Sequence, residues 1–200
     1  MIRRIQLTLL ALFVSVWAMA SETSVKNADG VEIWYDFDIN TMTASVTYKG
    51  KSRYTYDDEY IGNVVIPSKV TYKGEEYSVT KIGDDAFFSC RPTSITIPES
   101  LTEIGKNAFM YCHSLTSLTI PESVTEIGDY AFRACYKLYE VYNKSNLAIT
   151  AGSSENGDVA YYAKKVYTDD SGESKLKTVG DYIFYVDEDN IELLAYKHQE

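Results

Sequence analysis

The sequence predicts a β-rich (α+β) solenoid, in which short strands and the turns between them stack layer on layer. Ile-Gly-x-x-Ala-Phe occurs at residues 82–87, 104–109 and 127–132, and a Cys follows three residues after each Phe. Ser-x-Thr-Ile-Pro-Glu-Ser-x-Thr-Glu occurs at residues 94–103 and 117–126. The units recur after 22 and then 23 residues. Units this short cannot close a core alone, so each must bury its apolar side chains against its neighbours.

The apolar positions of each unit predict which side chains point inward. Alternate residues of a strand face the same side, so we expect one inward row of Ile95, Leu118, Val141, Ile97 and Ile120. A second inward row consists of Leu101, Val124, Ile82, Ile104 and Ile127. Pro98 and Pro121 should start the turns between the rows. We expect the Ala-Phe pairs to form turns or short helical segments, where Ala permits close approach and Phe fills volume.

The first period is the shorter one because Leu115 has no counterpart between Cys90 and Thr93. We therefore expect irregular geometry around residues 91–92.

The three cysteines stand at equivalent positions and should form a ladder along the stack: Cys90, Cys112 and Cys135. Parallel side chains in a ladder do not readily reach the torsion of a disulfide, so buried free thiols are expected. Only His113 and His198 could complete a metal-ligand set with them. We therefore predict no metal site and no cofactor.

Hairpins are predicted on both sides of the repeats. Residues 31–37 and 43–48 alternate apolar and polar side chains around a turn at 38–40, and residues 70–72 and 77–79 form a second pair. Near the C-terminus, residues 182–186 and 191–196 flank the polar segment Asp187-Glu188-Asp189-Asn190. These hairpins should cap the stack, whose terminal layers otherwise expose apolar surface.

The chain is expected to comprise four segments. Residues 1–20 read as a cleaved signal peptide, with Arg3 and Arg4, an apolar stretch, and Ala18-Met19-Ala20 as the cleavage site. Residues 21–78 hold the N-terminal cap and an entry strand around 64–66, and residues 79–146 hold three repeat units. Residues 147–200 are a C-terminal flank, which either caps the stack or introduces further repeats of a longer array. No second apolar run is long enough to span a bilayer.

The repeat Ile-Gly-x-x-Ala-Phe-x-x-Cys-x-x-Leu-x-x-Leu-x-Ile-Pro-x-x-Val resembles that of BspA-like leucine-rich-repeat surface proteins. The resemblance is close over residues 79–142, and residues 64–67 resemble the strand that precedes a first unit. It implies a short leucine-rich-repeat solenoid and a secreted or cell-surface protein. Some relatives act as adhesins that bind host matrix proteins or other cells. The family has no catalytic residues to carry over.

Composition and charge exclude several functions. The formal charge of −10 becomes −12 once Arg3 and Arg4 leave with the signal peptide, and such a surface repels nucleic acid and anionic membranes. The acidic runs 57–59, 169–170 and 187–189 fall in predicted turns, where solvated surface charge is the ordinary state of carboxylates. Neither His113 nor His198 lies in a nucleophile-and-base arrangement. We predict that the protein is not an enzyme.

The outward strand positions form the candidate binding surface, because they can vary without disturbing the core. Two columns are expected, together with Tyr139 at the position of Thr116: Ser94, Ser117 and Glu140 in one, Thr96, Thr119 and Tyr142 in the other. The last unit thus replaces small hydroxyl side chains with larger ones, and Tyr is favoured in interfaces. The alternative is that Tyr139 and Tyr142 only cover the C-terminal flank.

Three functions remain open at this stage. The first is recognition of a host or microbial surface protein through the outward columns. The second is carbohydrate binding, suggested by eighteen tyrosines and by Trp34. The third is a purely structural spacer. Asn143-Lys144-Ser145 is a glycosylation sequon, relevant only in a host that glycosylates exported Asn. The oligomeric state is not predicted.

Overall fold

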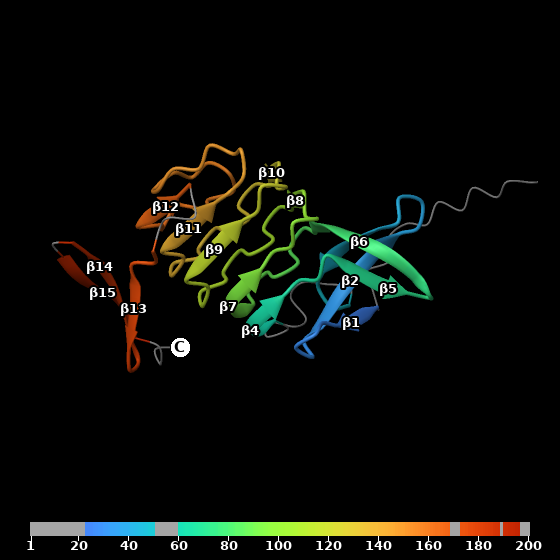
Figure 1. Ribbon diagram of the computed structural model, residues 1–200, viewed down its shortest axis with the longest axis horizontal. Helices are drawn as coiled ribbons and strands as arrows, with labels where there is room; N and C mark the ends of the chain where they lie inside the picture. Colours follow the sequence, from blue (N-terminus) through green and yellow to red (C-terminus); the bar gives the residue numbers. More distant parts are fainter. Residues whose placement is uncertain (1–22, 51–59, 169–172, 189, 197–200) are drawn as a thin grey trace, which may run out of the picture.

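The computed structural model describes residues 23–50, 60–168, 173–188 and 190–196 (Figure 1). The predicted signal peptide lies outside these residues, as do the acidic runs at 57–59 and 169–170, Asp189 and His198. The described residues form strands joined by turns. Among them, no helix has the length and apolar character needed to cross a bilayer.

The strands before and within the first repeat units are β1 (Ser24–Lys26), β2 (Glu32–Asp38), β3 (Thr43–Thr47), β4 (Ile61–Val65), β5 (Lys69–Tyr72), β6 (Glu75–Ile82), β7 (Arg91–Thr96) and β8 (Glu103–Ile104). Those that follow are β9 (Ser117–Ile120), β10 (Glu126–Ile127), β11 (Glu140–Asn143), β12 (Lys165–Tyr167), β13 (Leu176–Val179), β14 (Tyr182–Asp187) and β15 (Asn190–Tyr196).

Parallel strands run along two sides of the solenoid (Figure 1). One side contains the pair β4–β7 and the row β9–β11–β12. The other continues from β3 through β6 and β8 to β10. The β4–β7 register shifts between Gly62 and Asn63, opposite the shortened segment at Pro92 to Ser94, so the predicted irregularity is present. The predicted entry strand is β4.

Turns form the third side, and they are joined from unit to unit by backbone hydrogen bonds. The amides of Phe87, Phe109 and Phe132 each donate to the carbonyl of the following unit over 2.7 Å. Left-handed φ values recur at equivalent turn positions, as at Asp85, Asn107 and Tyr130. The Ala-Phe segments are therefore turns, and the helical alternative is not seen among the described residues.

The core is a ladder of aromatic and aliphatic side chains. Successive phenylalanine rings stack with centroids 4.8 Å apart for Phe87 and Phe109 and 4.9 Å for Phe109 and Phe132, both pairs tilted by only 14°. Tyr60 extends the ladder at 4.5 Å from Phe87, and its hydroxyl donates to the Thr47 carbonyl over 2.8 Å. The predicted inward rows are buried, with Ile127 half-buried.

The predicted cysteine ladder is also present: all three thiols are free and buried. Cys112 donates to the Phe87 carbonyl and Cys135 to the Phe109 carbonyl, each over 3.1 Å. These two thiols therefore each donate to a carbonyl of the preceding layer. Burial raises the pKa of Cys112 well above its ordinary value and the pKa of Cys135 to about 12.

The predicted N-terminal hairpins cover the first layer. β2 pairs antiparallel with β3 in the register Trp34 to Thr47, and β5 pairs antiparallel with β6 around the tight turn Lys73-Gly74. β3 then pairs in parallel with β6, so the cap continues the sheet of the solenoid.

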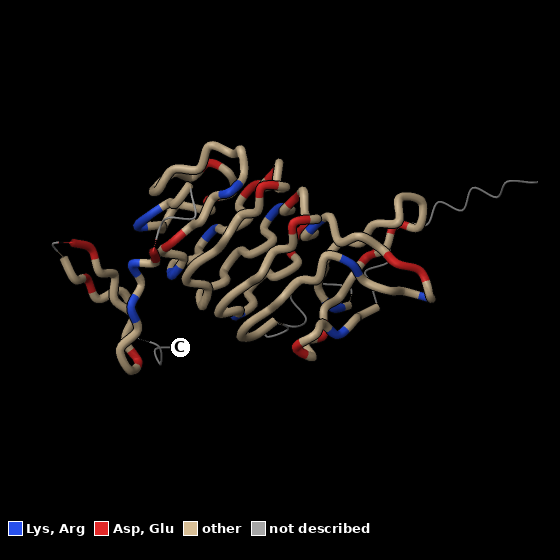
Figure 2. The backbone as a smooth tube through the Cα atoms, viewed as in Figure 1, with Lys and Arg blue, Asp and Glu red and all other residues tan. Residues whose placement is uncertain are grey.

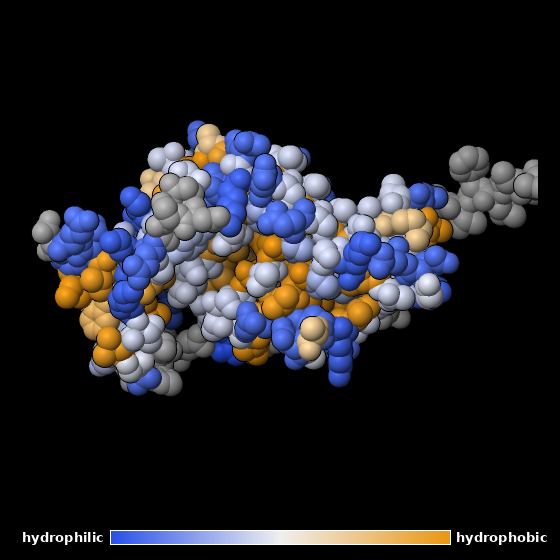
Figure 3. Space-filling model, in the orientation of Figure 1, coloured by the Kyte–Doolittle hydropathy of each residue, from blue (hydrophilic) through white to orange (hydrophobic). Residues whose placement is uncertain are grey.

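The C-terminal flank divides into a divergent layer and a small sheet. β12 pairs in parallel with β11 and so extends the row of β9 and β11 by one strand, although the sequence of β12 no longer matches the repeat motif. β14 and β15 form the predicted hairpin, and β13 adds a third antiparallel strand. One face of this sheet carries exposed Val179, Ile191 and Leu193, and Figure 3 shows a hydrophobic area there.

Replacing Phe109 with Ala should lower the free energy of unfolding by about 3 to 5 kcal/mol, because its ring is buried between two others and the cavity cannot collapse. Chemical denaturation measures the loss. The exposed Thr119→Ala control should stay within about 0.5 kcal/mol of the parent. A loss below about 1 kcal/mol for Phe109→Ala would contradict the stacked ladder.

Alkaline pH should destabilise the fold through the buried thiols. The folded state keeps its protons while the unfolded state releases them above the ordinary thiol pKa of 9.0, so stability is full below pH 9 and is lost as pH rises toward 12. The slope is at most about 1.4 kcal/mol per pH unit for each thiol. Thermal melting between pH 8 and 11 measures it, and Cys135→Ala should flatten the profile. An identical slope in that variant would assign the effect to other groups.

Candidate functional site

The strand register places the predicted columns as expected at the third unit. Ser117 lies beside Glu140, and Thr119 lies beside Tyr142. Thr96 and Thr119 are exposed, whereas Ser94 and Ser117 are half-buried. The small hydroxyl side chains therefore do border a solvent-facing strand surface.

The expectation that Tyr139 and Glu140 face solvent is wrong. Tyr139 is only 8% exposed and Glu140 is 0% exposed. The C-terminal flank covers both: the Tyr139 hydroxyl donates to the Leu194 carbonyl of β15 over 3.3 Å, and β12 lies against β11. The packing of the flank could not be read from the repeat, because the flank no longer follows the repeat motif.

Glu140 anchors the flank through three hydrogen bonds and accepts a fourth from its own strand, β11. Its carboxylate accepts from the Ser174 hydroxyl and the Lys175 amide, each over 2.7 Å. It also accepts from the hydroxyls of Tyr167 over 3.0 Å and Tyr142 over 3.1 Å. A buried carboxylate is costly unless hydrogen bonds replace its water, and these four bonds do so. Burial, with Glu140 beside it, raises the pKa of the Tyr167 hydroxyl.

Tyr142 is half-buried and stacks on Tyr167, with ring centroids 4.7 Å apart and planes 10° apart. Of the three large residues in the third unit, Tyr142 alone keeps substantial exposure. Its main contacts are nevertheless to the flank, as the alternative interpretation of these tyrosines expected.

A different surface gathers exposed aromatic residues. We define the aromatic strip as Tyr111, His113, Tyr136, Tyr161 and Tyr162. Its neighbouring rings lie 4.9 to 6.0 Å apart from centroid to centroid. Tyr111 is 38% exposed, Tyr136 52% and Tyr161 49%. The strip thus forms a continuous aromatic surface across three successive layers of the turn side.

The repeat itself aligns the strip. His113 and Tyr136 directly follow Cys112 and Cys135, so they occupy the same position in neighbouring units. Their backbones are held in register because the Tyr111 amide donates to the Arg133 carbonyl over 3.0 Å. Sequence reasoning placed His113 in a solvent-facing turn but did not align it with Tyr136. The sequence pattern that indicates this alignment is the shared position directly after Cys112 and Cys135.

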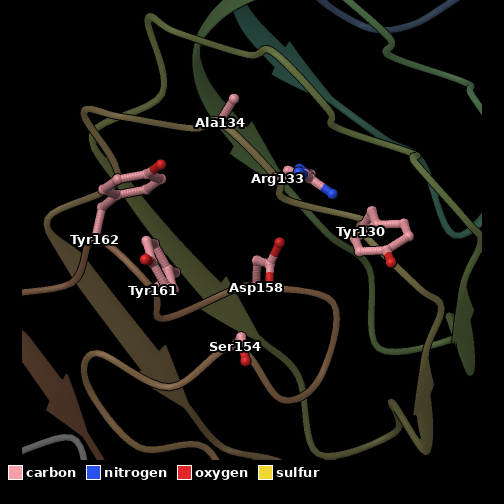
Figure 4. A pocket seen from close by; sticks show the side chains of 7 residues that line it. All are labelled: Tyr130, Arg133, Ala134, Ser154, Asp158, Tyr161 and Tyr162. Atoms are coloured by element: carbon pink, nitrogen blue, oxygen red, sulfur yellow. The ribbon is translucent and has the colours of Figure 1, made fainter.

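A hollow of about 310 Å³ adjoins the end of the strip (Figure 4). It is lined by Tyr130, Arg133, Ala134, Ser154, Asp158, Tyr161 and Tyr162. The Arg133 guanidinium lies over the Tyr130 ring, 4.9 Å from its centroid. The hollow forms between the turn of the third unit and the longer loop that follows β11.

Of the other candidate groups, the structure describes His113, Asp187 and Glu188. His113 contacts aromatic rings in the strip, and Asp187 lies at an exposed hairpin turn, 3.9 Å from the Lys175 ammonium group. Among the described residues, no group of three or more His, Cys, Asp and Glu side chains could hold a metal ion. Figure 2 shows acidic residues along the turns next to β8 and β10.

The predicted sequon is inaccessible in the folded chain. Asn143 is 6% exposed, and its side-chain amide donates to the Leu147 carbonyl over 2.9 Å. The side-chain Oδ1 of Asn143 accepts from the Ser145 hydroxyl over 2.7 Å. This asparagine therefore shapes the turn after β11.

A family model for the BspA type leucine rich repeat region, with six copies, matches residues 52–187. The chain belongs to this family. The family assignment and the β-rich repeat fold predicted from the sequence are both confirmed. The matching model describes BspA-type repeats and indicates no catalytic family. No curated protein matches the chain.

Solved structures include similar repeat proteins. A leucine-rich repeat protein from Bacteroides capillosus is 27% identical to this BspA-type chain with a TM-score of 0.54, over 73% of this chain and 98% of its own. A leucine rich cell surface protein from Faecalibacterium prausnitzii is 18% identical with a TM-score of 0.32, over 88% of this chain and 62% of its own. The pneumococcal vaccine antigen PcpA is 14% identical with a TM-score of 0.40, over 82% and 54%.

Replacing Glu140 with Ala should loosen the flank of this BspA-type chain, because each buried donor left without an acceptor costs roughly 1 to 3 kcal/mol. Hydrogen exchange followed by mass spectrometry should show faster exchange at the Lys175 amide and across β13 and β14. The exposed Glu122→Ala change is the matched control and should leave exchange unaltered. Unchanged protection at Lys175 in Glu140→Ala would show that Glu140 does not anchor the flank.

Proposed function

We propose that this BspA-type protein is a non-catalytic recognition protein, exported through its N-terminal signal peptide, that binds another protein outside the cell through the aromatic strip. The exposed, continuous strip carries the proposal. Monomeric proteins seldom expose large apolar groups side by side unless the patch serves in binding.

The composition of the strip suits protein recognition. Tyr side chains offer a large contact area with few rotatable bonds, so little conformational entropy is lost on binding. The hydroxyl at the tip of each ring supplies a hydrogen-bond donor and acceptor. His113 adds a polar ring between Tyr111 and Tyr136.

The backbone beneath the strip supports binding by holding the rings in place before a partner arrives. Tyr111 and Tyr136 flank Cys112 and Cys135, whose thiols are buried and hydrogen-bonded to the preceding layer. A preorganised surface loses less entropy on association than a flexible loop. Recognition through this strip therefore requires no reshaping of the solenoid.

The strand columns become the polar border of the proposed surface. Each strip residue that follows a Cys stands four positions before the column residue of the next strand, as His113 does before Ser117. Ser117 and Thr119 therefore lie on β9, which begins four residues after His113, whereas Ser94 and Thr96 lie on β7, one unit before the strip begins. Tyr139 and Glu140 are removed from the proposed surface because they are buried. The net charge of −10 favours a neutral or basic partner face.

Ala substitution of Tyr136 should weaken partner binding at least tenfold, because a central aromatic residue typically contributes more than about 1.4 kcal/mol. The partner is first isolated on the immobilised mature chain from host matrix and bacterial surface-protein extracts. Its dissociation constant is then measured by biolayer interferometry against purified variants.

The exposed Thr96→Ala change on β7, one unit before the strip, is the matched control and should alter affinity less than threefold, since residues away from the centre of an interface contribute little. Equal affinity of the parent and Tyr136→Ala chains, with folding verified by circular dichroism, would contradict the strip. If only Tyr139→Ala weakened binding, the effect would be due to a change in the packing of the C-terminal flank, because the Tyr139 ring is buried beneath it.

A further inference from the structure

The hollow of Figure 4 combines aromatic surfaces with polar groups. Tyr161 and Tyr162 meet edge to face with centroids 4.9 Å apart and planes 80° apart, so they present rings in two directions. Tyr130 lies on the other side and is 46% exposed. The volume of about 310 Å³ lies at the lower end of the range for small-molecule sites.

Two opposite charges border the same hollow without neutralising each other. Arg133 is positioned by its contact with the Tyr130 ring, and Asp158 stands on the facing loop (Figure 4). Within the described part of the chain, neither side chain forms a hydrogen bond or ion pair. A set of donors, a set of acceptors and the Ser154 hydroxyl therefore remain available to a ligand.

The loop that carries Asp158 is held firmly against the third unit. The Phe132 amide donates to the Gly157 carbonyl over 2.7 Å. A side chain at Gly157 would lie 2.9 Å from the Cβ of Ala131, and its φ of +64° also favours Gly. The next residues, Val159 and Ala160, are buried. The carboxylate is thus presented by an ordered backbone.

A second hollow, of about 420 Å³, continues around the same loop. It shares Tyr130, Ser154 and Asp158 with the first hollow and adds the acidic residues Asp129 and Glu155. A ligand longer than one ring can therefore extend from one hollow to the next. The added carboxylates repel anionic ligands.

We propose that this hollow binds a neutral sugar unit of an oligosaccharide. A pyranose carries C–H groups on one face that cover a tyrosine ring, and hydroxyls at its edge that both donate and accept hydrogen bonds. Asp158 accepts from two adjacent hydroxyls while Arg133 donates to another, and charge-assisted bonds of this kind are the stronger ones. An apolar peptide side chain would leave both charges without partners, which is costly.

This inference goes beyond the proposed protein recognition, because its polar residues lie outside the aromatic strip. Tyr161 and Tyr162 border both surfaces, but Arg133, Ser154 and Asp158 belong to the hollow alone. Tyr136 belongs to the strip, but its ring lies 5.1 Å from that of Tyr162, which lines the hollow. Asp158→Asn leaves every strip residue in place, so this variant tests sugar binding separately from protein recognition.

The test uses the mature chain and five probes: linear tetrasaccharides of glucose, galactose, mannose and N-acetylglucosamine, and a sialylated tetrasaccharide. Saturation-transfer NMR detects binding, and isothermal titration calorimetry measures the dissociation constant. At least one neutral probe should bind with a constant of about 1 mM or tighter. Asp158→Asn and Tyr161→Ala should each weaken that binding at least tenfold. The sialylated probe should bind less tightly.

Glu122→Gln removes one exposed charge elsewhere and should leave the dissociation constant unchanged. Thermal melting verifies that each variant is folded. The proposal is overturned if none of the four neutral probes binds, if the sialylated probe binds most tightly, or if Asp158→Asn and Tyr161→Ala retain the parent affinity. Loss of sugar binding in Asp158→Asn with unchanged protein binding supports the separation of the two sites.

Discussion

The backbone hydrogen bonds between successive turns are the constraint on which the structure depends. Phe87, Phe109 and Phe132 each donate to the next unit over the same 2.7 Å, which holds the layers in register. Only with that register do the phenylalanine rings stack and the cysteine thiols reach the preceding carbonyls. Each unit is too short to bury its own apolar side chains. The fold is therefore stable only when neighbouring units stack with the same spacing.

The sequence predicts the repeats well because their side chains face a repeating environment. Ile104 and Ala108 meet equivalent neighbours in the units before and after, so one motif implies their burial. The hairpins are also predictable from the sequence, because alternating apolar and polar residues around a polar turn form a local pattern. The C-terminal flank was not predicted in the same way. Its strand β12 is positioned by pairing with β11, and the sequence of β12 no longer follows the repeat motif.

The candidate site was predicted only in part, for a physical reason. Alternation identifies which strand residues point outward, and Thr96 and Thr119 are indeed exposed. Alternation does not indicate which later segment packs over an outward residue. The burial of Glu140 depends on Ser174 and Lys175, which lie far along the chain and donate to its carboxylate. An outward carboxylate in a repeating row becomes a buried anchor once a segment without the repeat lies across it.

The same loss of periodicity accompanies the hollow that we propose as a sugar site. Gly157 stands where the next Ala would be, but 26 residues after Ala131, compared with 23 from Ala108 to Ala131. The three additional residues lengthen the segment between these positions, and Ser154 of that segment lines the hollow. A perfectly periodic solenoid presents the same shallow surface at every layer. In this chain the aromatic strip and the hollow meet at Tyr162, in the layer where the repeat motif is lost.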